Sequence, residues 1–457
     1  MSGGDGGARW RMEGLRVLAA PGAEPFEGAI EVRDGTIAAL GPALPPPEPG
    51  VPILDRSGHV ALPAFVQGHV HLCQTLFQGL AENRPLDRWL RERMWPLEAA
   101  HDPDSIRASV RLGAAEALLH GATTLLDMGT VRHTEVIAET LAETGLRATI
   151  GKALMDTGEA VPDSLRDDPE AAVRESLALH DRWDGGAHGR LRVAFAPRFT
   201  LSVSAGLWRE IAAEARHRGM LVHTHASETP WENETCLRMH GETPVRALRS
   251  WGVLDAPCVL VHAVWVDDEE RALLAAHRAG VVHCPGSNAK LGSGIALLAP
   301  LLEAGVAVAL GSDASACNDL LSVPAEMRLA AQLQSIASGA GRVGPRDIFS
   351  MATAMGARAV GMGGLTGELA PGMRADLVLY RAEDLWPPDG PLEQRLVFGP
   401  ASLARPVEVF VAGRPLVRGG ELVGMERTEL QREAARERQR LLARLERKGP
   451  QWKSRSN

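Results

Sequence analysis

The sequence predicts an α/β fold in which a (β/α)8 TIM-type barrel is joined to a small β-sandwich domain built from both chain ends. Strand-like apolar runs alternate with helical stretches through the middle of the chain. Short strands separated by turns occupy both ends, and several central runs finish in a histidine or an acid. Repeated βα units are typical of a parallel sheet or barrel, and barrel chemistry lies at the carboxyl ends of the strands.

The length and composition suit such a fold. The chain has 457 residues, against roughly 250 for a barrel alone, and 45% of them are hydrophobic, which is ample for a large core. The net charge of −8 provides no basic surface for nucleic acid and no polybasic patch for a membrane.

The cysteines and the apolar runs bear on the compartment. The five cysteines form no CxxC pair, which favours a reducing compartment. No apolar run reaches the roughly 18 residues of a transmembrane helix, and the N-terminal segment lacks the apolar stretch of a secretory signal. We therefore expect a soluble, cytoplasmic protein.

Residues 1–62 are expected to form the first part of the β domain. Residues 1–8 are rich in glycine and are expected to be disordered. Short apolar runs separated by turn residues then indicate antiparallel strands at 15–18, 29–32 and 36–40.

Residues 63–366 are expected to form the barrel. Helical stretches such as 104–120 and 207–218 lie between strand-like runs, as repeated βα units require. The clearest of these runs are 123–126, 191–195, 221–225, 259–262, 281–283 and 306–310.

The C-terminal part returns to short strands. Residues 367–425 contain apolar runs at 375–380 and 407–413 and are expected to complete the β domain. Residues 426–457 are dense in Glu, Arg and Leu and predict an exposed, charged amphipathic helix.

Two strand-like runs end in paired histidines. The first ends in His69 and His71, and the second in His223 and His225, with Glu228 three residues further on. Residues i and i+2 of an extended segment face the same side. Both members of a pair can therefore approach one ion.

Two further runs end near single polar residues, His262 and Asp313. A histidine at a strand end is often a core residue, and an Asp after Gly-Ser often caps a turn. Polar groups that end several strands of one barrel indicate a metal site more strongly than any one of them does. Three imidazoles and a carboxylate suit Zn²⁺, with Fe²⁺ as the alternative, and leave a position open for water.

The order HxH, HxxE, His and Asp resembles the amidohydrolase superfamily, and within it the mononuclear deaminase and chlorohydrolase branch. The resemblance covers essentially the whole chain and includes PAFVQGHVH at 63–71, CPGSNAKL at 284–291, GSDASACN at 311–318 and GELAPGMRADLV at 367–378. Among its members, the deaminases of 5′-deoxyadenosine, methylthioadenosine and S-adenosylhomocysteine look most similar.

The resemblance implies a role for each matching residue. Glu228 matches the proton shuttle, and His262 matches the imidazole that orients the attacking water. His223 shares a face with His225 but matches no ligand, and it is expected to support the site or pack in the core. One divalent cation per chain would be held by His69, His71, His225 and Asp313.

These residue types fit hydrolytic deamination of an adenine ring. A cation lowers the pKa of bound water toward about 7, and Asp313 can take the water's proton. Glu228 can protonate ring N1, which makes C6 open to attack, and His262 can stabilise the adduct. The implied reaction converts an adenosine-type nucleoside to its inosine analogue and ammonia.

The resemblance also implies substrate contacts. Trp89 matches a residue that stacks on the purine, and Glu98 matches one that accepts hydrogen bonds from both ribose hydroxyls. Their structural alternatives are helix packing for Trp89 and an ion pair with Arg93 for Glu98. Lys152 matches a basic position that contacts the 5′ substituent. It is also the only obvious candidate for a carboxylated lysine that would bridge two metals.

Other residues indicate a different ring. Gln74, Arg198 and Phe199 resemble the guanine deaminase pattern, in which such residues hold the guanine edge, and some methylthioadenosine deaminases have His in place of Arg198. Cys317 stands beside the metal Asp where relatives have Ser.

Three hypotheses follow from these patterns. The first is a deaminase of an adenosine-type nucleoside. The second is a deaminase of guanine or another free heterocycle, or a triazine hydrolase. The third is a barrel that binds a metal or ligand without catalysis, which the intact set of polar residues disfavours. The expected partner is a small purine-like molecule, with neither nucleic acid nor membrane involved, and the resemblance implies a homo-oligomer.

Overall fold

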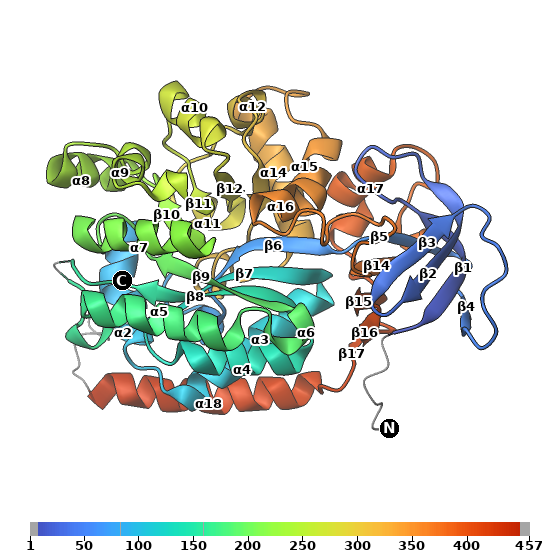
Figure 1. Cartoon of the computed structure of the whole chain (residues 1–457), viewed down its shortest axis with the longest axis horizontal. Helices are drawn as coiled ribbons and strands as arrows, with labels where there is room; N and C mark the ends of the chain where they lie inside the picture. The colour runs from blue at the N-terminus through green and yellow to red at the C-terminus, as the bar shows by residue number, and fades with distance from the viewer. Residues whose placement is uncertain (1–7, 83, 159, 448–457) are drawn as a thin grey trace.

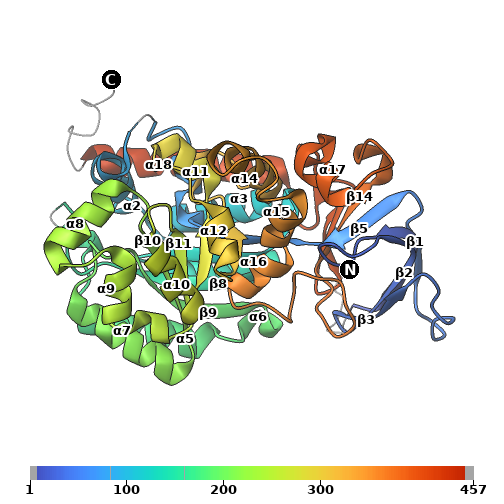
Figure 2. The same ribbon diagram turned by 90° about the horizontal axis from the view of Figure 1, so that it is seen from above.

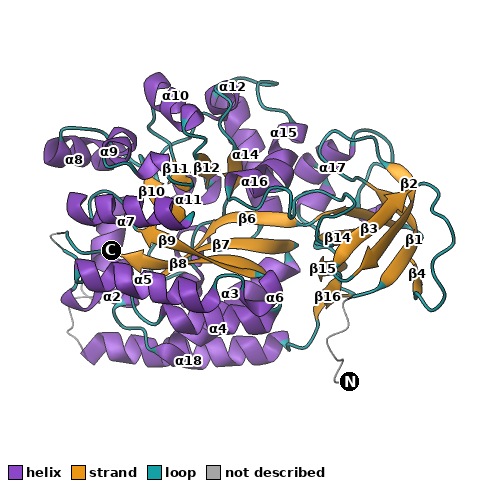
Figure 3. Ribbon diagram, viewed as in Figure 1, coloured by secondary structure: helices purple, strands orange, loops and turns teal. Residues whose placement is uncertain are grey.

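The computed structural model describes residues 8–82, 84–158 and 160–447, and these form a barrel flanked by a smaller sheet (Figure 1). Figure 2 shows the barrel strands surrounded by helices, with the small sheet standing to one side. Both parts contain strands, whereas most of the helical residues surround the barrel (Figure 3).

Eight parallel strands form the barrel, and each lies beside its neighbours in sequence. The first strand returns to the last through a parallel bridge between Val70 and Asp313, where the Asp313 amide donates to the His69 carbonyl at 3.1 Å. Most residues of these strands are buried on both faces, as expected of a parallel sheet covered by helices. The strands are β6 (Phe65–Val70), β7 (Ala122–Thr130), β8 (Arg147–Leu154), β9 (Leu191–Pro197), β10 (Leu221–Ala226), β11 (Cys258–His262), β12 (Gly280–His283) and β13 (Val308–Leu310).

Helices cover the barrel, and several of them begin at a side-chain cap. Asp102 and Ser105 form a reciprocal capping box before α3, and Asp267 and Glu270 form one before α10. These helices are α3 (Pro103–Leu119), α4 (Thr134–Thr144), α5 (Pro169–Trp183), α6 (Gly186–Gly189), α7 (Ala205–Arg218), α8 (Pro230–His240), α9 (Pro244–Ser250), α10 (Asp268–Ala276), α11 (Pro285–Leu291), α12 (Leu298–Glu303), α13 (Ser315–Asn318), α14 (Val323–Ala337), α15 (Pro345–Ala352) and α16 (Ala354–Ala359).

A long connection between β6 and α3 carries short helical turns. A 3-10 helix, η1 (Leu72–Phe77), follows the first histidine pair directly. Then α1 (Leu86–Trp89), the π-helical turn η2 (Leu90–Met94) and α2 (Trp95–Glu98) run on without a break. A π-helical turn inside a helix is rare and is often found at functional sites.

The smaller sheet is built from both ends of the chain, as the sequence predicts. Strand β5 lies between β1, from the N-terminal part, and β14, from the C-terminal part. The strands form one hydrogen-bonded order, β17-β16-β15-β14-β5-β1-β2-β3, with β4 beside β1. They are β1 (Trp10–Val17), β2 (Phe26–Arg33), β3 (Thr36–Gly41), β4 (Ile53–Asp55), β5 (His59–Pro63), β14 (Leu377–Arg381), β15 (Glu408–Val411), β16 (Arg414–Arg418) and β17 (Glu421–Leu422).

The barrel and the small sheet are tightly joined. Only Ala64 separates β5 from β6, so the chain passes directly from one sheet to the other. Arg147, at the start of β8, forms a buried ion pair with Asp376, which precedes β14, with Nε–Oδ2 at 2.8 Å. A buried ion pair of good geometry is costly to break from one side, so this pair links the two parts.

Two C-terminal helices lie against the barrel. The first, α17 (Leu392–Phe398), packs on α14 and α15, although the sequence places its residues in the small β domain. The second, α18 (Arg427–Arg447), packs on α3 (Figure 1). The predicted charged helix therefore has one buried face, formed by Leu430, Ala434, Glu437, Leu441 and Leu445.

Two expectations fall at the chain ends. Those for residues 1–7 and 448–457 lie outside the described residues. Within the described part of the chain, no helix combines the length and apolar character needed to cross a membrane.

Candidate active site

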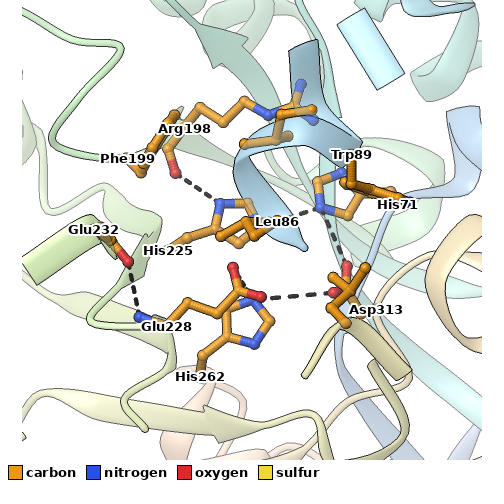
Figure 4. A pocket seen from close by; sticks show the side chains of 12 residues that line it. His71, Leu86, Trp89, Arg198, Phe199, His225, Glu228, Glu232, His262 and Asp313 are labelled. Carbon is orange, nitrogen blue, oxygen red and sulfur yellow. Dashed lines mark hydrogen bonds and ion pairs between the residues drawn. The ribbon is translucent and has the colours of Figure 1, made fainter. Parts of the chain in front are cut away.

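Four side chains that could ligate a metal converge at the carboxyl ends of the barrel strands. His69 belongs to β6 and His71 follows it, His225 belongs to β10, and Asp313 lies just after β13. One ligand atom from each lies within 4.8 Å of the others. Figure 4 shows His71, His225 and Asp313 facing one another in the pocket.

The imidazoles of His225 and His69 are each held through Nδ1, the ring nitrogen that faces away from the centre of the four ligand atoms. The Nδ1 of His225 donates to the Arg198 carbonyl at 2.7 Å. The Nδ1 of His69 lies 2.9 Å from Nε2 of His223, which places His223 behind the ligand group. The Nε2 atoms are therefore left to face the centre, and that of His69 has no hydrogen-bond partner among the described residues. Such outer contacts fix the tautomer and orientation of metal-ligating histidines.

The carboxylate of Asp313 completes the group. Its Oδ1 lies 3.3 Å from Nε2 of His69 and 3.4 Å from Nε2 of His71, while Oδ2 accepts from Ser287 Oγ at 2.7 Å. Burial alone would raise the pKa of Asp313, but the close His69 imidazole and the other surrounding histidines hold it well below the ordinary value.

The protonation states suit a cation. Burial, reinforced by the neighbouring imidazoles, places the pKa values of His71 and His225 well below the ordinary value, so both are neutral. Neutral imidazole and ionised carboxylate are the forms that bind metals. An otherwise unpartnered His69 Nε2 that faces an ionised carboxylate and two other Nε2 atoms fits a divalent cation.

Glu228 and His262 lie beside the ligand group. The Nε2 of His262 is 3.5 Å from Oε2 of Glu228 and 3.9 Å from Oδ2 of Asp313. Burial raises the pKa of Glu228 above its ordinary value. A carboxyl group of this kind can hold a proton for transfer.

The backbone at this edge of the barrel is strained. His262 and Asp313 have φ angles of 74° and 60°, and Ser227, just before Glu228, has 55°. Side chains other than glycine rarely adopt this left-handed region, and residues held there gather at functional sites.

The pocket next to the ligand group has apolar walls. Leu86, Trp89 and Leu90 cover one side, and Phe199 and Leu291 contribute others. The structure therefore brings Trp89 and Phe199 to the predicted site (Figure 4). Aromatic and aliphatic walls with a few polar groups are typical of a small-molecule site.

Glu98, Arg198 and Gln74 form one buried cluster. Arg198 donates to Glu98 through Nη1–Oε2 at 2.6 Å and Nη2–Oε1 at 3.0 Å, and Gln74 Nε2 donates to Glu98 Oε1 at 2.7 Å. Arg198 lines the pocket, whereas Glu98 and Gln74 are not among the described residues that line it. Glu98 thus forms a buried ion pair with Arg198.

Lys152 and Cys317 stand apart from the pocket lining. The Lys152 ammonium lies 3.2 Å from Oδ1 of Asp167 and 3.6 Å from Oε2 of Glu175. Lys152 is thus engaged by carboxylates and is not among the described residues that line the pocket. Cys317 is buried on α13, and its thiol donates to the Ala314 carbonyl at 3.4 Å.

The sequence analysis missed Glu232, which also lines the pocket. It is fully buried, and its Oε2 accepts from the Glu228 amide at 2.7 Å. Burial raises the pKa of Glu232 to about 7. Thr229 and Glu232 have the spacing of a helix-start capping box, which could have drawn attention to this glutamate.

Ser287, Asn288 and Ser293 were also missed. Each forms a hydrogen bond with one of the predicted catalytic residues. Ser287 and Asn288 lie in the stretch 284–291 that carries part of the family resemblance, and Ser293 lies just beyond it. Serine and asparagine have no distinctive spacing that would single them out.

Comparisons with known proteins agree with this geometry. A model of the amidohydrolase family matches residues 60–416. The chain is 34% identical, over 95% of its length and 99% of the relative, to a 5-methylthioadenosine/S-adenosylhomocysteine deaminase of Pelotomaculum thermopropionicum. It is 36% identical to a 5′-deoxyadenosine deaminase of Methanothermobacter thermautotrophicus, covering 90% of this chain and 94% of the relative.

A solved structure shares the architecture. An adenosine deaminase from Xanthomonas campestris with bound zinc superimposes with a TM-score of 0.87 at 29% identity, covering 95% of this chain and 99% of that one. The match extends over both the barrel and the small sheet, since it leaves little of either chain uncovered.

Proposed function

The chain belongs to the amidohydrolase family, and we propose that it is a metal-dependent deaminase of adenosine-type nucleosides. The substrates would be 5′-deoxyadenosine, methylthioadenosine, S-adenosylhomocysteine or adenosine, and the products the inosine analogue and ammonia. The observation that carries the proposal is the meeting of four ligand atoms with Glu228 and His262 in one apolar-walled pocket. Relatives named as deaminases of such nucleosides support it.

The ligands of one divalent cation would be His69, His71, His225 and Asp313. Zinc is the proposed metal, because three imidazoles and one carboxylate suit it and because the Xanthomonas campestris structure has bound zinc. When bound, the cation supplies Lewis-acid activation of a water molecule.

The chain's own residues would handle the protons. Glu228, whose pKa is raised by burial, holds a proton and passes it to ring N1, which makes C6 open to attack. Asp313 is ionised and accepts a proton from the attacking water. His262 places Nε2 within 4 Å of both carboxylates, where it can hydrogen-bond to the tetrahedral adduct. A second proton transfer from the enzyme then releases ammonia.

The pocket walls favour a flat ring. Trp89 and Phe199 can stack on a purine, and together with Leu86 they exclude water from the reacting face. The alternative, recognition of a guanine edge by Arg198, would use a guanidinium whose two terminal nitrogens already donate to Glu98. The same pair engages both oxygens of Glu98, so it does not decide between the rings, and we favour the nucleoside over the free base because of the relatives named as nucleoside deaminases.

Ammonia release from a substrate panel tests the proposal. The panel contains the four nucleosides, guanine and a triazine, and zinc-loaded protein is expected to act on at least one nucleoside far faster than on guanine. Turnover of guanine alone would favour the second hypothesis. The absence of any turnover by fully metal-loaded protein would favour a binding barrel. Light scattering of the same preparation tests the proposed homo-oligomer.

A further inference from the structure

One stretch of chain contacts all three proposed proton-handling residues. Residues 285–293, which we call the positioning segment, comprise α11 and the two residues that follow it. We propose that this segment sets which atom of Asp313, His262 and Glu228 faces the reacting centre. For His262 and Glu228 the proposal rests on the proposed function. For Asp313 it rests only on metal binding.

The first contact concerns the metal ligand. Ser287 Oγ donates to Oδ2 of Asp313 at 2.7 Å. The other oxygen, Oδ1, is the one that lies 3.3 Å and 3.4 Å from the Nε2 atoms of His69 and His71. By occupying Oδ2, Ser287 leaves Oδ1 as the oxygen that joins the ligand group.

The second contact concerns the imidazole. The Nδ1 of His262 donates to Oδ1 of Asn288 at 2.8 Å, and both residues are buried. This bond directs the opposite nitrogen, Nε2, toward the carboxylates of Glu228 and Asp313. A histidine's working nitrogen is set in this way by the hydrogen bond that its other nitrogen makes.

The third contact concerns the proton shuttle. Ser293 Oγ donates to Oε1 of Glu228 at 2.9 Å. Because Oε1 accepts this hydrogen bond, the proton that Glu228 carries resides on Oε2. That oxygen is the one that faces His262 Nε2 at 3.5 Å. Ser293 therefore selects the oxygen that delivers the proton.

The positioning segment is itself held firmly. The Gly286 amide donates to Oε2 of Glu326 at 2.9 Å, and Trp265 Nε1 donates to the Ser293 carbonyl at 2.7 Å. A side chain at Gly286 would lie 2.6 Å from Nδ2 of Asn318, so the close approach requires glycine. A side chain can orient its hydrogen-bond partner only when it is itself held in place. These contacts hold the positioning segment in place.

Two matched serine variants separate this role from simple packing. Ser287→Ala and Ser293→Ala remove the same hydroxyl from the same segment, but only Ser287 contacts a metal ligand. Ser250→Ala is the control, because Ser250 Oγ also donates to a glutamate, Glu242, at 2.9 Å, on the exposed surface. Three measurements are made on each: metal release to a chelator by elemental analysis, kcat and KM, and thermal unfolding.

The expected results differ between the two variants. Ser287→Ala weakens metal binding roughly 10- to 100-fold, the usual effect of losing a contact behind a ligand. Ser293→Ala keeps its metal and its KM but lowers kcat roughly 10- to 100-fold, because the lost hydrogen bond would stabilise the carboxylate charge that develops on Glu228 as its proton is transferred. Asn288→Ala behaves like Ser293→Ala, and Ser250→Ala behaves like the wild type.

Two outcomes would overturn the proposal. If Ser287→Ala and Ser293→Ala lose metal, activity and thermal stability in parallel, the segment is only a packing element. If either variant matches the wild type in every measurement, the hydrogen bond that its serine makes to Asp313 or Glu228 does not orient that carboxylate. The measurement of metal release needs no substrate. If the wild-type protein were inactive on every purine, the proposed function would be refuted, but the role of Ser287 in metal binding could still be tested.

Discussion

Glu98 and Arg198 form a two-pronged ion pair, with Nη1–Oε2 at 2.6 Å and Nη2–Oε1 at 3.0 Å, between two segments 100 residues apart in sequence. Glu98 is 6% exposed and Arg198 is 4% exposed. The pair joins the end of α2 to the end of β9 beside the pocket. It therefore ties the segment that carries Trp89 to the end of β9, which gives Glu98 a structural role beside the pocket.

Removal of one partner should expose this structural role. Glu98→Ala leaves a buried, unpaired guanidinium and is expected to lower the free energy of unfolding by about 3–5 kcal/mol. Denaturant unfolding of metal-loaded protein measures it. Glu303→Ala, which removes the exposed partner of Arg342, is the control and should cost about 1 kcal/mol or less. Equal costs for the two variants would contradict a strong buried pair.

The same substitution also tests ribose recognition. At temperatures where Glu98→Ala stays folded, its kcat/KM for 5′-deoxyadenosine or methylthioadenosine is expected to fall roughly 10- to 150-fold, the range for a lost charged hydrogen bond. Activity on a free base should change far less. An equal loss on both classes of substrate would mean that Glu98 acts only through Arg198 and the shape of the pocket.

The proton shuttle and a metal ligand should separate cleanly. Glu228→Gln is expected to retain the metal and to lose at least roughly 100-fold in kcat, the scale of a general acid–base group. His225→Ala is expected to lose the metal, because its Nε2 belongs to the ligand group. Elemental analysis beside steady-state kinetics decides the assignment, and the reverse pattern would exchange the two roles.

Metal removal is expected to abolish activity and to reveal one ion. The protein should contain about one divalent ion per chain, and zinc should restore activity after chelation. Lys152 pairs with Asp167, and a carboxylated lysine would place negative charge against that carboxylate. Two tightly bound ions together with a carboxylated Lys152 would contradict a mononuclear site.

Glu326 should make stability depend on pH. Burial raises its pKa from 4.5 to about 7, so the folded state holds a proton that the unfolded state releases. Its contribution to stability is complete below about pH 4.5 and is lost as the pH rises through 7. Over this window the unfolding free energy should fall by up to about 1.4 kcal/mol per pH unit. Glu326→Gln should flatten the slope in denaturant unfolding at several pH values, and an unchanged slope would assign it to other groups.

The fold and the ligand group were predictable because their signals are local. The two-residue period places His69 and His71 on one side of a strand, and parallel strands carry their ends to the same edge of the barrel. The alternation of strand-like runs with helical stretches predicts the βα repeat in the same way. These features need no knowledge of which distant residues touch.

The remaining features depend on contacts that the sequence does not encode locally. Glu98 and Arg198 supported rival interpretations of the substrate, and only their spatial pairing shows that they belong to one cluster. Likewise, α17 follows a strand of the small sheet in sequence but lies on barrel helices in space. The roles of Ser287 and Ser293 arise from the path of the chain around the barrel, since a lone serine has no distinctive spacing.

The position of β5 between β1 and β14 has a consequence for biosynthesis. The central strand of the small sheet pairs with a partner more than 300 residues later, and the strand that follows it carries His69. A growing chain cannot complete this sheet until nearly all of it has left the ribosome. The first metal-binding strand is thus tethered to an unfinished edge for most of translation, and unpaired edges invite wrong association. The small sheet is therefore completed late, when the strands of residues 377–422 reach β5.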